Sequence, residues 1–139
     1  MAYIKKIDHI GIVVADMKEA IKAYKKLLFK EPSCLERHEE AKVDLAFFDV
    51  GEIQVELLAP CAPDSEVSSF LEEKGGGIHH VCFEVEGIEE ILEELKKKGM
   101  KLIDEHPRPG SRDSHVAFVD PASAKGVYIE YCEFPKSKG

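Results

Sequence analysis

The sequence predicts an α+β fold in which two repeated βαβββ modules form a curved mixed sheet around a metal-binding cleft. Three observations predict it: a repeat at a nearly constant offset, short runs typical of strands, and two His and two Glu residues at matching positions. A chain of 139 residues, 44% of them hydrophobic, can bury one core but is too short for two ordinary domains. We therefore expect a single domain over residues 1–139, with module one at about 4–60, a linking helix at about 64–74 and module two at about 77–134.

The second half of the chain repeats the first at a shift of 71 residues, which places His80 under His9. A stretch with the i, i+3, i+4, i+7 apolar spacing of an amphipathic helix follows in both halves. Its superposed residues are Met17, Ala20, Ile21 and Tyr24 with Ile88, Ile91, Leu92 and Leu95. The same shift matches AFFD at 46–49 with AFVD at 117–120, and after a three-residue insertion the shift becomes 74. Such a repeat predicts two copies of one module.

Each module reads as β-α-β-β-β. Four short runs are rich in β-branched and aromatic residues and predict strands: VDLAFFDV, IQVELLAP, HVAFVD and VYIEYC. Asp16 begins the first helix as part of a capping box, and Gly99 suits the end of the second helix. Between the modules, Asp64 or Ser65 caps a short helix, and the glycines at 75–77 predict a hinge.

Two histidines and two glutamates occupy repeat-related strand positions: His9 with His80, and Glu56 with Glu130. A carboxylate inside an apolar strand such as VELL or YIEYC is costly unless it is paired or binds a metal. Modules packed around a pseudo-twofold axis bring the four side chains to one point. Two imidazoles and two carboxylates neutralise a divalent ion, and without thiolate the set favours Co²⁺, or Mn²⁺, Ni²⁺, Zn²⁺ or Fe²⁺, in six coordination.

Other polar residues near these positions have simpler interpretations. Gln54 shares the strand parity of Glu56 and is an alternative ligand, but its repeat partner is Tyr128, which favours Glu56. His79 precedes His80 and is expected to face the other way, in a structural role. Three histidines without a repeat partner are interpreted as solvated residues of loops or strand ends: His38, His106 and His115.

Composition excludes several classes of partner. With 27 acidic and 19 basic residues the net charge is −8, which argues against nucleic acid and anionic membranes. No apolar stretch approaches the roughly 20 residues of a membrane span, and no signal-peptide cleavage pattern is visible, so we expect a cytoplasmic protein. The four cysteines form no CxxC pair, and we interpret each as a small buried hydrophobe: Cys34, Cys61, Cys82 and Cys132.

With these residues in place, the chain resembles the methylmalonyl-CoA epimerases of the vicinal oxygen chelate superfamily, which includes the glyoxalases. The resemblance runs from DHIGI at 8–12 to VYIE at 127–130, and its more specific segments are IQVELLAP, GGGIHH, EHPRPGS, FVDP and KGVYIEY. It departs from the family at Asp120, where members commonly have His before Pro, and at 41–42, where Gly is usual. Carried over, the metal ligands of the family fall on His9, Glu56, His80 and Glu130.

The resemblance implies interconversion of (R)- and (S)-methylmalonyl-CoA, in which the proton α to the thioester is removed and returned while the cation stabilises the enolate. It implies an acyl-CoA substrate and, by analogy with relatives, a homodimer. Glu130 is the first candidate base, and Glu40 and Asp44 are candidates for the opposite base. Four basic residues are candidates for contact with CoA phosphates: Arg108, Arg112, Lys42 and Lys125.

Two rival functions share this fold. A glyoxalase I resembles the chain in fold and metal set but isomerises a glutathione hemithioacetal. A metal-free small-molecule binding protein of the same fold uses the cavity for binding alone, and the intact ligand set argues against it. A ring-cleaving dioxygenase is disfavoured because it normally uses a three-ligand facial triad with iron.

Overall fold

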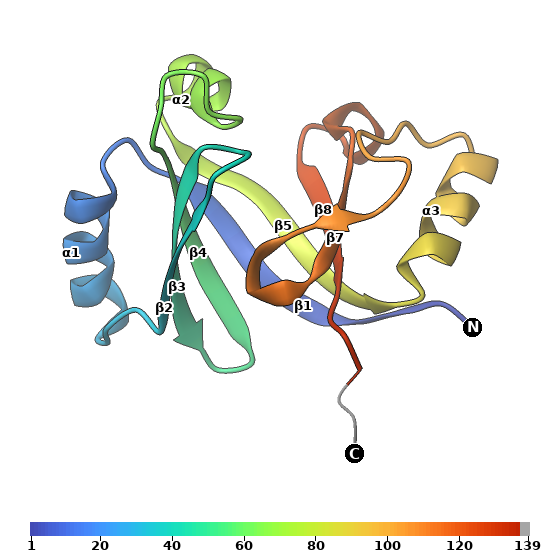
Figure 1. Cartoon of the computed structure of the whole chain (residues 1–139), viewed down its shortest axis with the longest axis horizontal. Helices are drawn as coiled ribbons and strands as arrows, with labels where there is room; N and C mark the ends of the chain where they lie inside the picture. The colour runs from blue at the N-terminus through green and yellow to red at the C-terminus, as the bar shows by residue number, and fades with distance from the viewer. Residues whose placement is uncertain (137–139) are drawn as a thin grey trace. The chain divides into compact units, whose positions relative to one another are not determined.

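The computed structural model describes residues 1–136, which form eight strands and three α-helices (Figure 1). The strands are β1 (Tyr3–Val13), β2 (Cys34–His38), β3 (Val43–Val50), β4 (Ile53–Pro60), β5 (Gly77–Glu86), β6 (Arg108–Pro109), β7 (His115–Val119) and β8 (Tyr128–Glu133). The helices are α1 (Met17–Leu28), α2 (Ser68–Lys74) and α3 (Ile88–Lys97), with short 3-10 turns at Ser111–Asp113 and Pro121–Ala124.

The hydrogen-bonded order of the strands is β2-β3-β4-β1-β5-β8-β7-β6. The pairs β1/β4 and β5/β8 are parallel, whereas β2/β3, β3/β4, β6/β7 and β7/β8 are antiparallel. The sheet is therefore mixed, and each half of the chain contributes a βαβββ module. This confirms the predicted fold class, including the positions of β3 and β4.

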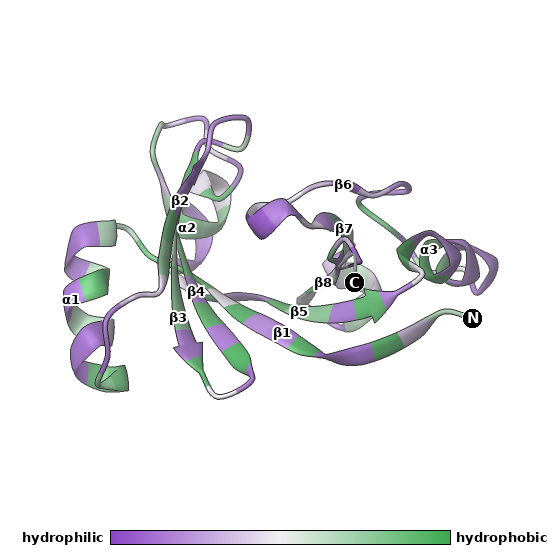
Figure 2. Ribbon diagram, turned by 60° about the horizontal axis from the view of Figure 1, so that its bottom comes forward, coloured by the Kyte–Doolittle hydropathy of each residue, from purple (hydrophilic) through white to green (hydrophobic). Residues whose placement is uncertain are grey.

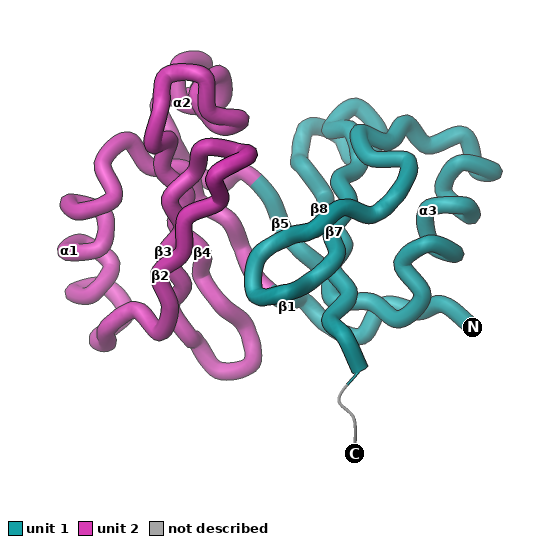
Figure 3. Tube along the Cα trace, viewed as in Figure 1, with its two compact units in different colours: residues 1–8, 80–139 teal, residues 9–79 magenta. Residues whose placement is uncertain are grey.

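Contacts within the chain group its residues into two compact units (Figure 3). Unit 2 is residues 9–79, and unit 1 combines residues 1–8 with the chain from residue 80 onward. The first six residues of β1 thus belong with the second module, although the repeat assigns them to the first.

In unit 2, α1 packs its apolar stripe against one face of β3 and β4 (Figure 1). Figure 2 shows hydrophilic and hydrophobic residues interleaved along α1, as expected for a helix with one solvent-facing side. The apolar side covers Ala46, Phe48 and Leu57, all fully buried. The predicted cap is confirmed, because the Asp16 carboxylate accepts the Glu19 N–H at 3.1 Å.

The opposite face of the same strands is covered by the segment around α2. Val13, Leu45 and Phe47 pack there with Val67, and Phe70 of α2 joins them. The prediction for this helix was partly wrong. Neither candidate caps it directly: the helix begins at Ser68 after Val67, and Ser65 Oγ instead accepts the Val67 N–H.

In unit 1, α3 packs Ile88 and Leu92 against Val85 and Ala117 of the sheet. Gly87 stands at the N-cap and offers no side chain to cap the helix. The Glu133 carboxylate at the end of β8 takes that role, accepting the Gly87 and Ile88 N–H groups at 2.8 and 3.1 Å. A carboxylate at a helix N-terminus is also favoured by the helix dipole.

Ion pairs connect the start of β1 to the rest of unit 1. Lys5 lies 3.6 and 3.3 Å from the carboxylates of Glu84 and Glu86. Asp8 accepts a 2.5 Å hydrogen bond from Arg112, whose guanidinium also lies over the Phe134 ring. Asp8 is buried, and the ion pair with Arg112 offsets part of the cost of burying its charge.

The cysteine prediction holds for two of the four residues. Cys82 and Cys132 are buried in unit 1, Cys34 is half-buried, and Cys61 is exposed, contrary to expectation. None of the helices in residues 1–136 is both long and apolar enough to span a membrane.

The glycines at 75–77 differ in what they require. All three have positive φ, but only at Gly76, with φ of +106°, would an added Cβ meet backbone, 2.9 Å from the Val13 carbonyl oxygen. Gly75 has φ of +77° and open space. We predict that Gly76→Ala lowers the free energy of unfolding by about 3 kcal/mol, against about 1 kcal/mol for the control Gly75→Ala. Urea unfolding of both variants tests this, and equal losses would contradict it.

Candidate metal centre

The first candidate pair lies in unit 2, on the face of the sheet opposite α1. His9 of β1 and Glu56 of β4 approach within 3.4 Å, measured from Nε2 to Oε1, and both side chains are almost fully buried. In the ladder, Glu56 stands beside Gly11 on one side and Phe47 on the other. The Phe47 ring meets the His9 ring edge-to-face at 6.3 Å.

The second pair lies in unit 1 and has the same construction. His80 of β5 and Glu130 of β8 approach within 3.2 Å, again from Nε2 to Oε1, and both are buried. Glu130 stands between Cys82 and Phe118, the repeat counterparts of Gly11 and Phe47. The Phe118 ring meets the His80 ring edge-to-face at 5.6 Å.

The alternation of side chains along a strand explains why each glutamate lies on the sheet face that is turned away from the helix of its own module. In β4, Val55 and Leu57 point toward α1, so Glu56 points away from it. In β8, Tyr131 packs with the residues under α3, so Glu130 points to the other side. Within each unit, the structure thus brings one of the predicted histidines next to one of the predicted glutamates.

The donor atoms of both pairs suit a divalent ion. Ligand bonds of about 2.1 Å at right angles put adjacent ligand atoms about 3 Å apart, close to the 3.4 and 3.2 Å measured here. Imidazole nitrogen with carboxylate oxygen is a donor set for borderline transition ions. In both units a carboxylate is buried among apolar residues, which costs free energy. A bound cation would offset that cost.

Cys82 lies next to this set, with its ligand atom close to those of Asp8 and His9. It is fully buried beside Cys132 and Glu130, and burial raises the pKa of its thiol well above the usual value. The small side chain of Cys82 leaves room beside Glu130.

The two candidates for the opposite base are placed differently. Asp44 lies on the α1 side of β3, because side chains two residues apart in a strand share a face, and Ala46 and Phe48 pack under α1. Arg37 donates two hydrogen bonds to it, at 2.6 and 3.1 Å, and holds the pKa of the Asp44 carboxyl below its usual value. Glu40 is exposed in the turn between β2 and β3. The structure therefore does not bring Asp44 together with His9 and Glu56.

The other polar candidates are mostly engaged elsewhere. The Gln54 amide donates to Asp49 at 2.5 Å, and Lys42 forms an ion pair with Asp64. The His79 ring packs edge-to-face on Phe70 at 4.9 Å, which fits the predicted structural role. Lys125, His106 and His115 are exposed, and His38 lies 3.3 Å from Glu36.

Arg108 differs from these, because it lies beside the second pair. Its guanidinium carbon is 5.6 Å from the centre of the Phe118 ring, and its Nε is 3.2 Å from Asp104. Asp104 also accepts the Phe118 N–H at 2.9 Å. Sequence reasoning missed Asp104 and both phenylalanines, although the match of Phe47 with Phe118 at shift 71 was visible in the repeat.

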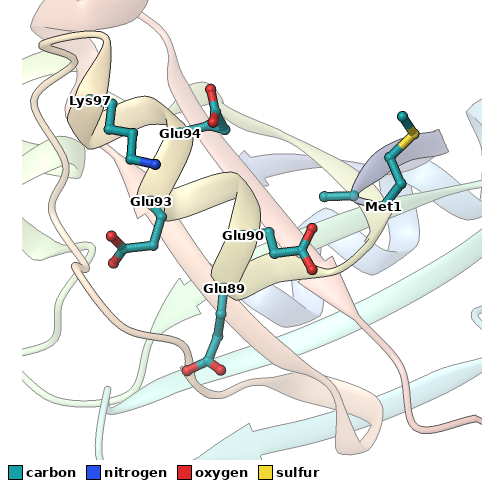
Figure 4. Close-up of a pocket in the computed structure, with 7 residues that line it drawn as sticks. Met1, Glu89, Glu90, Glu93, Glu94 and Lys97 are labelled. Atoms are coloured by element: carbon teal, nitrogen blue, oxygen red, sulfur yellow. The ribbon is translucent and has the colours of Figure 1, made fainter.

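A separate depression between α3 and the first two residues does not contain the candidate ligands (Figure 4). It is lined by the acidic side of the helix, with Glu89, Glu90, Glu93 and Glu94 beside Lys97. Four carboxylates repel an anionic ligand. An acyl-CoA, which carries several phosphate charges, is therefore not expected to bind there.

Known proteins resemble the chain in both sequence and structure. The model of the Glyoxalase/Bleomycin resistance protein/Dioxygenase superfamily matches residues 8–118. The uncharacterized protein YqjC of Bacillus subtilis is 40% identical over 92% of this chain and 91% of its own length. The human mitochondrial methylmalonyl-CoA epimerase is 33% identical over 90% of this chain and 72% of its own length.

A solved structure extends this likeness to a protein with bound ligand. A variant of the Streptomyces coelicolor methylmalonyl-CoA epimerase, in complex with 2-nitronate-propionyl-CoA, is similar with a TM-score of 0.91. The two chains are 28% identical, and the match covers 99% of each. Relatives of this fold thus bind acyl-CoA ligands.

Proposed function

Because the chain belongs to the Glyoxalase/Bleomycin resistance protein/Dioxygenase superfamily, we propose that it is a metal-dependent epimerase that interconverts (R)- and (S)-methylmalonyl-CoA. The observation that carries the proposal is the pair of buried His–Glu contacts, one in each unit, at repeat-related positions. The kinship with methylmalonyl-CoA epimerases supports the choice of substrate.

In this proposal both pairs hold one divalent ion, with His9, Glu56, His80 and Glu130 as its ligands. Their donors carry two negative charges, which match a divalent ion, and leave coordination positions for substrate oxygens. Co²⁺ is the first choice because of the family resemblance, and Mn²⁺, Ni²⁺, Zn²⁺ and Fe²⁺ suit the same donors. When bound, the ion supplies Lewis-acid polarisation of the thioester carbonyl, which acidifies the adjacent C–H.

The residues of the chain then move the proton. A Glu130 carboxylate oxygen takes the proton from the α carbon, and the electron pair of the broken C–H bond delocalises into the thioester carbonyl. Return of a proton to the opposite face of the planar carbon inverts the configuration. The buried residues Cys82, Val116 and Cys132 give Glu130 an apolar surrounding. Glu40 stays a prediction for the base on the opposite face, whereas the position of Asp44 on the α1 side of β3 argues against Asp44 in that role.

The shared ion predicts the behaviour of single histidine variants. His9→Ala and His80→Ala should each weaken Co²⁺ binding by more than about 100-fold, because each removes a ligand of the same ion. His115→Ala, a change at an exposed histidine, should leave binding unaltered. Metal analysis after dialysis would show one ion per chain in the wild type. Two ions per chain, with one lost in each variant, would refute the shared site.

The assignment of Glu130 as base predicts unequal effects at the two glutamates. With Co²⁺-loaded protein in D₂O, methylmalonyl-CoA should exchange its α proton and lose its configuration. Glu130→Gln should slow this by about 100-fold or more, since it removes a general base. Glu56→Gln, the same change at the repeat-related ligand, should slow it less.

Equal losses in these two variants would remove Glu130 from the role of base. The hemithioacetal of methylglyoxal and glutathione serves as the competing substrate in the same assay. Turnover of that substrate without exchange of the methylmalonyl-CoA proton would replace the epimerase proposal with a glyoxalase I activity.

A further inference from the structure

The two modules carry an arginine at the same repeat position but turn it to opposite faces of the sheet. Arg37 and Arg108 are related by the shift of 71 residues. Arg37 pairs with Asp44 on the α1 side, away from His9 and Glu56. Arg108 pairs in the ladder with Val116, which packs with Cys82 and Cys132 on the side of Glu130.

Arg108 is held in place on that side by two contacts. Its guanidinium lies over the Phe118 ring, and its Nε is 3.2 Å from Asp104. Asp104 is itself fixed, because it accepts the N–H of Phe118, the residue whose ring touches His80. An arginine oriented in this way has lost much of its rotamer freedom before any ligand arrives.

The chemistry of a guanidinium defines its ligand. Arginine binds carboxylates and phosphates through parallel N–H donors, with bonds about twice as strong as those between neutral groups. The site face also holds two glutamates, and the chain has a net charge of −8, so an anionic substrate needs local positive charge. Arg108 places that charge next to only one of the two His–Glu pairs.

Resting on the proposed function, we propose that Arg108 binds an oxyanion of the acyl-CoA substrate and so determines which end of the substrate lies beside His80 and Glu130. The ligand set alone is nearly symmetric, whereas the substrate is not. Arg108 in the second module, with Arg37 of the first turned away, breaks that symmetry. The oxyanion is either the carboxylate of the acyl group or a phosphate of CoA.

Binding measurements separate these sources. Calorimetric titration would use the wild type, Arg108→Gln and the matched control Arg37→Gln. The ligands are methylmalonyl-CoA, propionyl-CoA, which lacks the carboxylate, and methylmalonyl-pantetheine, which lacks the nucleotide phosphates. Arg108→Gln should raise the Kd for methylmalonyl-CoA by about tenfold to 100-fold, which is the contribution of one charge-assisted hydrogen bond to binding. Arg37→Gln should change the Kd less than about twofold.

The pattern of losses identifies the oxyanion. If Arg108→Gln weakens the binding of methylmalonyl-CoA but not that of propionyl-CoA, Arg108 binds the carboxylate. If it weakens the binding of methylmalonyl-CoA but not that of methylmalonyl-pantetheine, Arg108 binds a phosphate. Arg108→Lys, which keeps the charge and disturbs the fold less, should restore part of the affinity. An equal loss with all three ligands, or none with methylmalonyl-CoA, overturns the inference.

These outcomes remain separate from the test of the epimerase. Wild type that binds methylmalonyl-CoA without exchanging its proton refutes the proposed reaction, while the effect of Arg108 on Kd still stands. Wild type that binds none of the three thioesters refutes both. Binding and exchange in the wild type, with an unchanged Kd in Arg108→Gln, refutes the inference alone.

Discussion

The buried contact between a histidine and a glutamate, built once in each module, is the constraint around which the rest of the sheet is arranged. A carboxylate on an apolar sheet face is tolerated only where its neighbours leave room and supply charge. Each Glu therefore stands beside a small residue, Gly11 or Cys82, and opposite a phenylalanine. That phenylalanine meets the ring of the histidine edge-to-face, so the imidazole is held by packing as well as by its strand.

Outside the His–Glu positions, equivalent elements of the two modules are stabilised by different residues. The first helix is capped by its own Asp16, whereas the second has Gly87 at that point and borrows Glu133 from the end of β8. The repeated scaffold thus provides a buried His–Glu pair in each module, and the divergent surroundings distinguish the two pairs. An asymmetric reaction on a repeated fold requires such a difference, because symmetric ligands alone cannot distinguish the two ends of a substrate.

Much of this arrangement could be predicted, because the repeat offset and the alternation of side chains along a strand can be read directly from the sequence. The choice of His9, Glu56, His80 and Glu130 as candidate ligands needed only a nearly constant shift and the alternation of side chains along a strand. Asp44 could have been assigned to the α1 face by the same parity argument, since it lies two residues from Ala46. The cap from Glu133 and the contact of Asp104 with the Phe118 backbone join residues 46 and 14 positions apart, which no local pattern reveals. The homodimer and the cytoplasmic location stay predictions.

The proposed chemistry requires that one cation is bound by both His–Glu pairs. Crystals of the Co²⁺-loaded protein, with data collected above and below the cobalt absorption edge, test it directly. A shared ion would give a single strong anomalous peak per chain, within bonding distance of His9, Glu56, His80 and Glu130. Separate peaks at the two pairs, or cobalt bound only at exposed carboxylates such as those of α3, would contradict it.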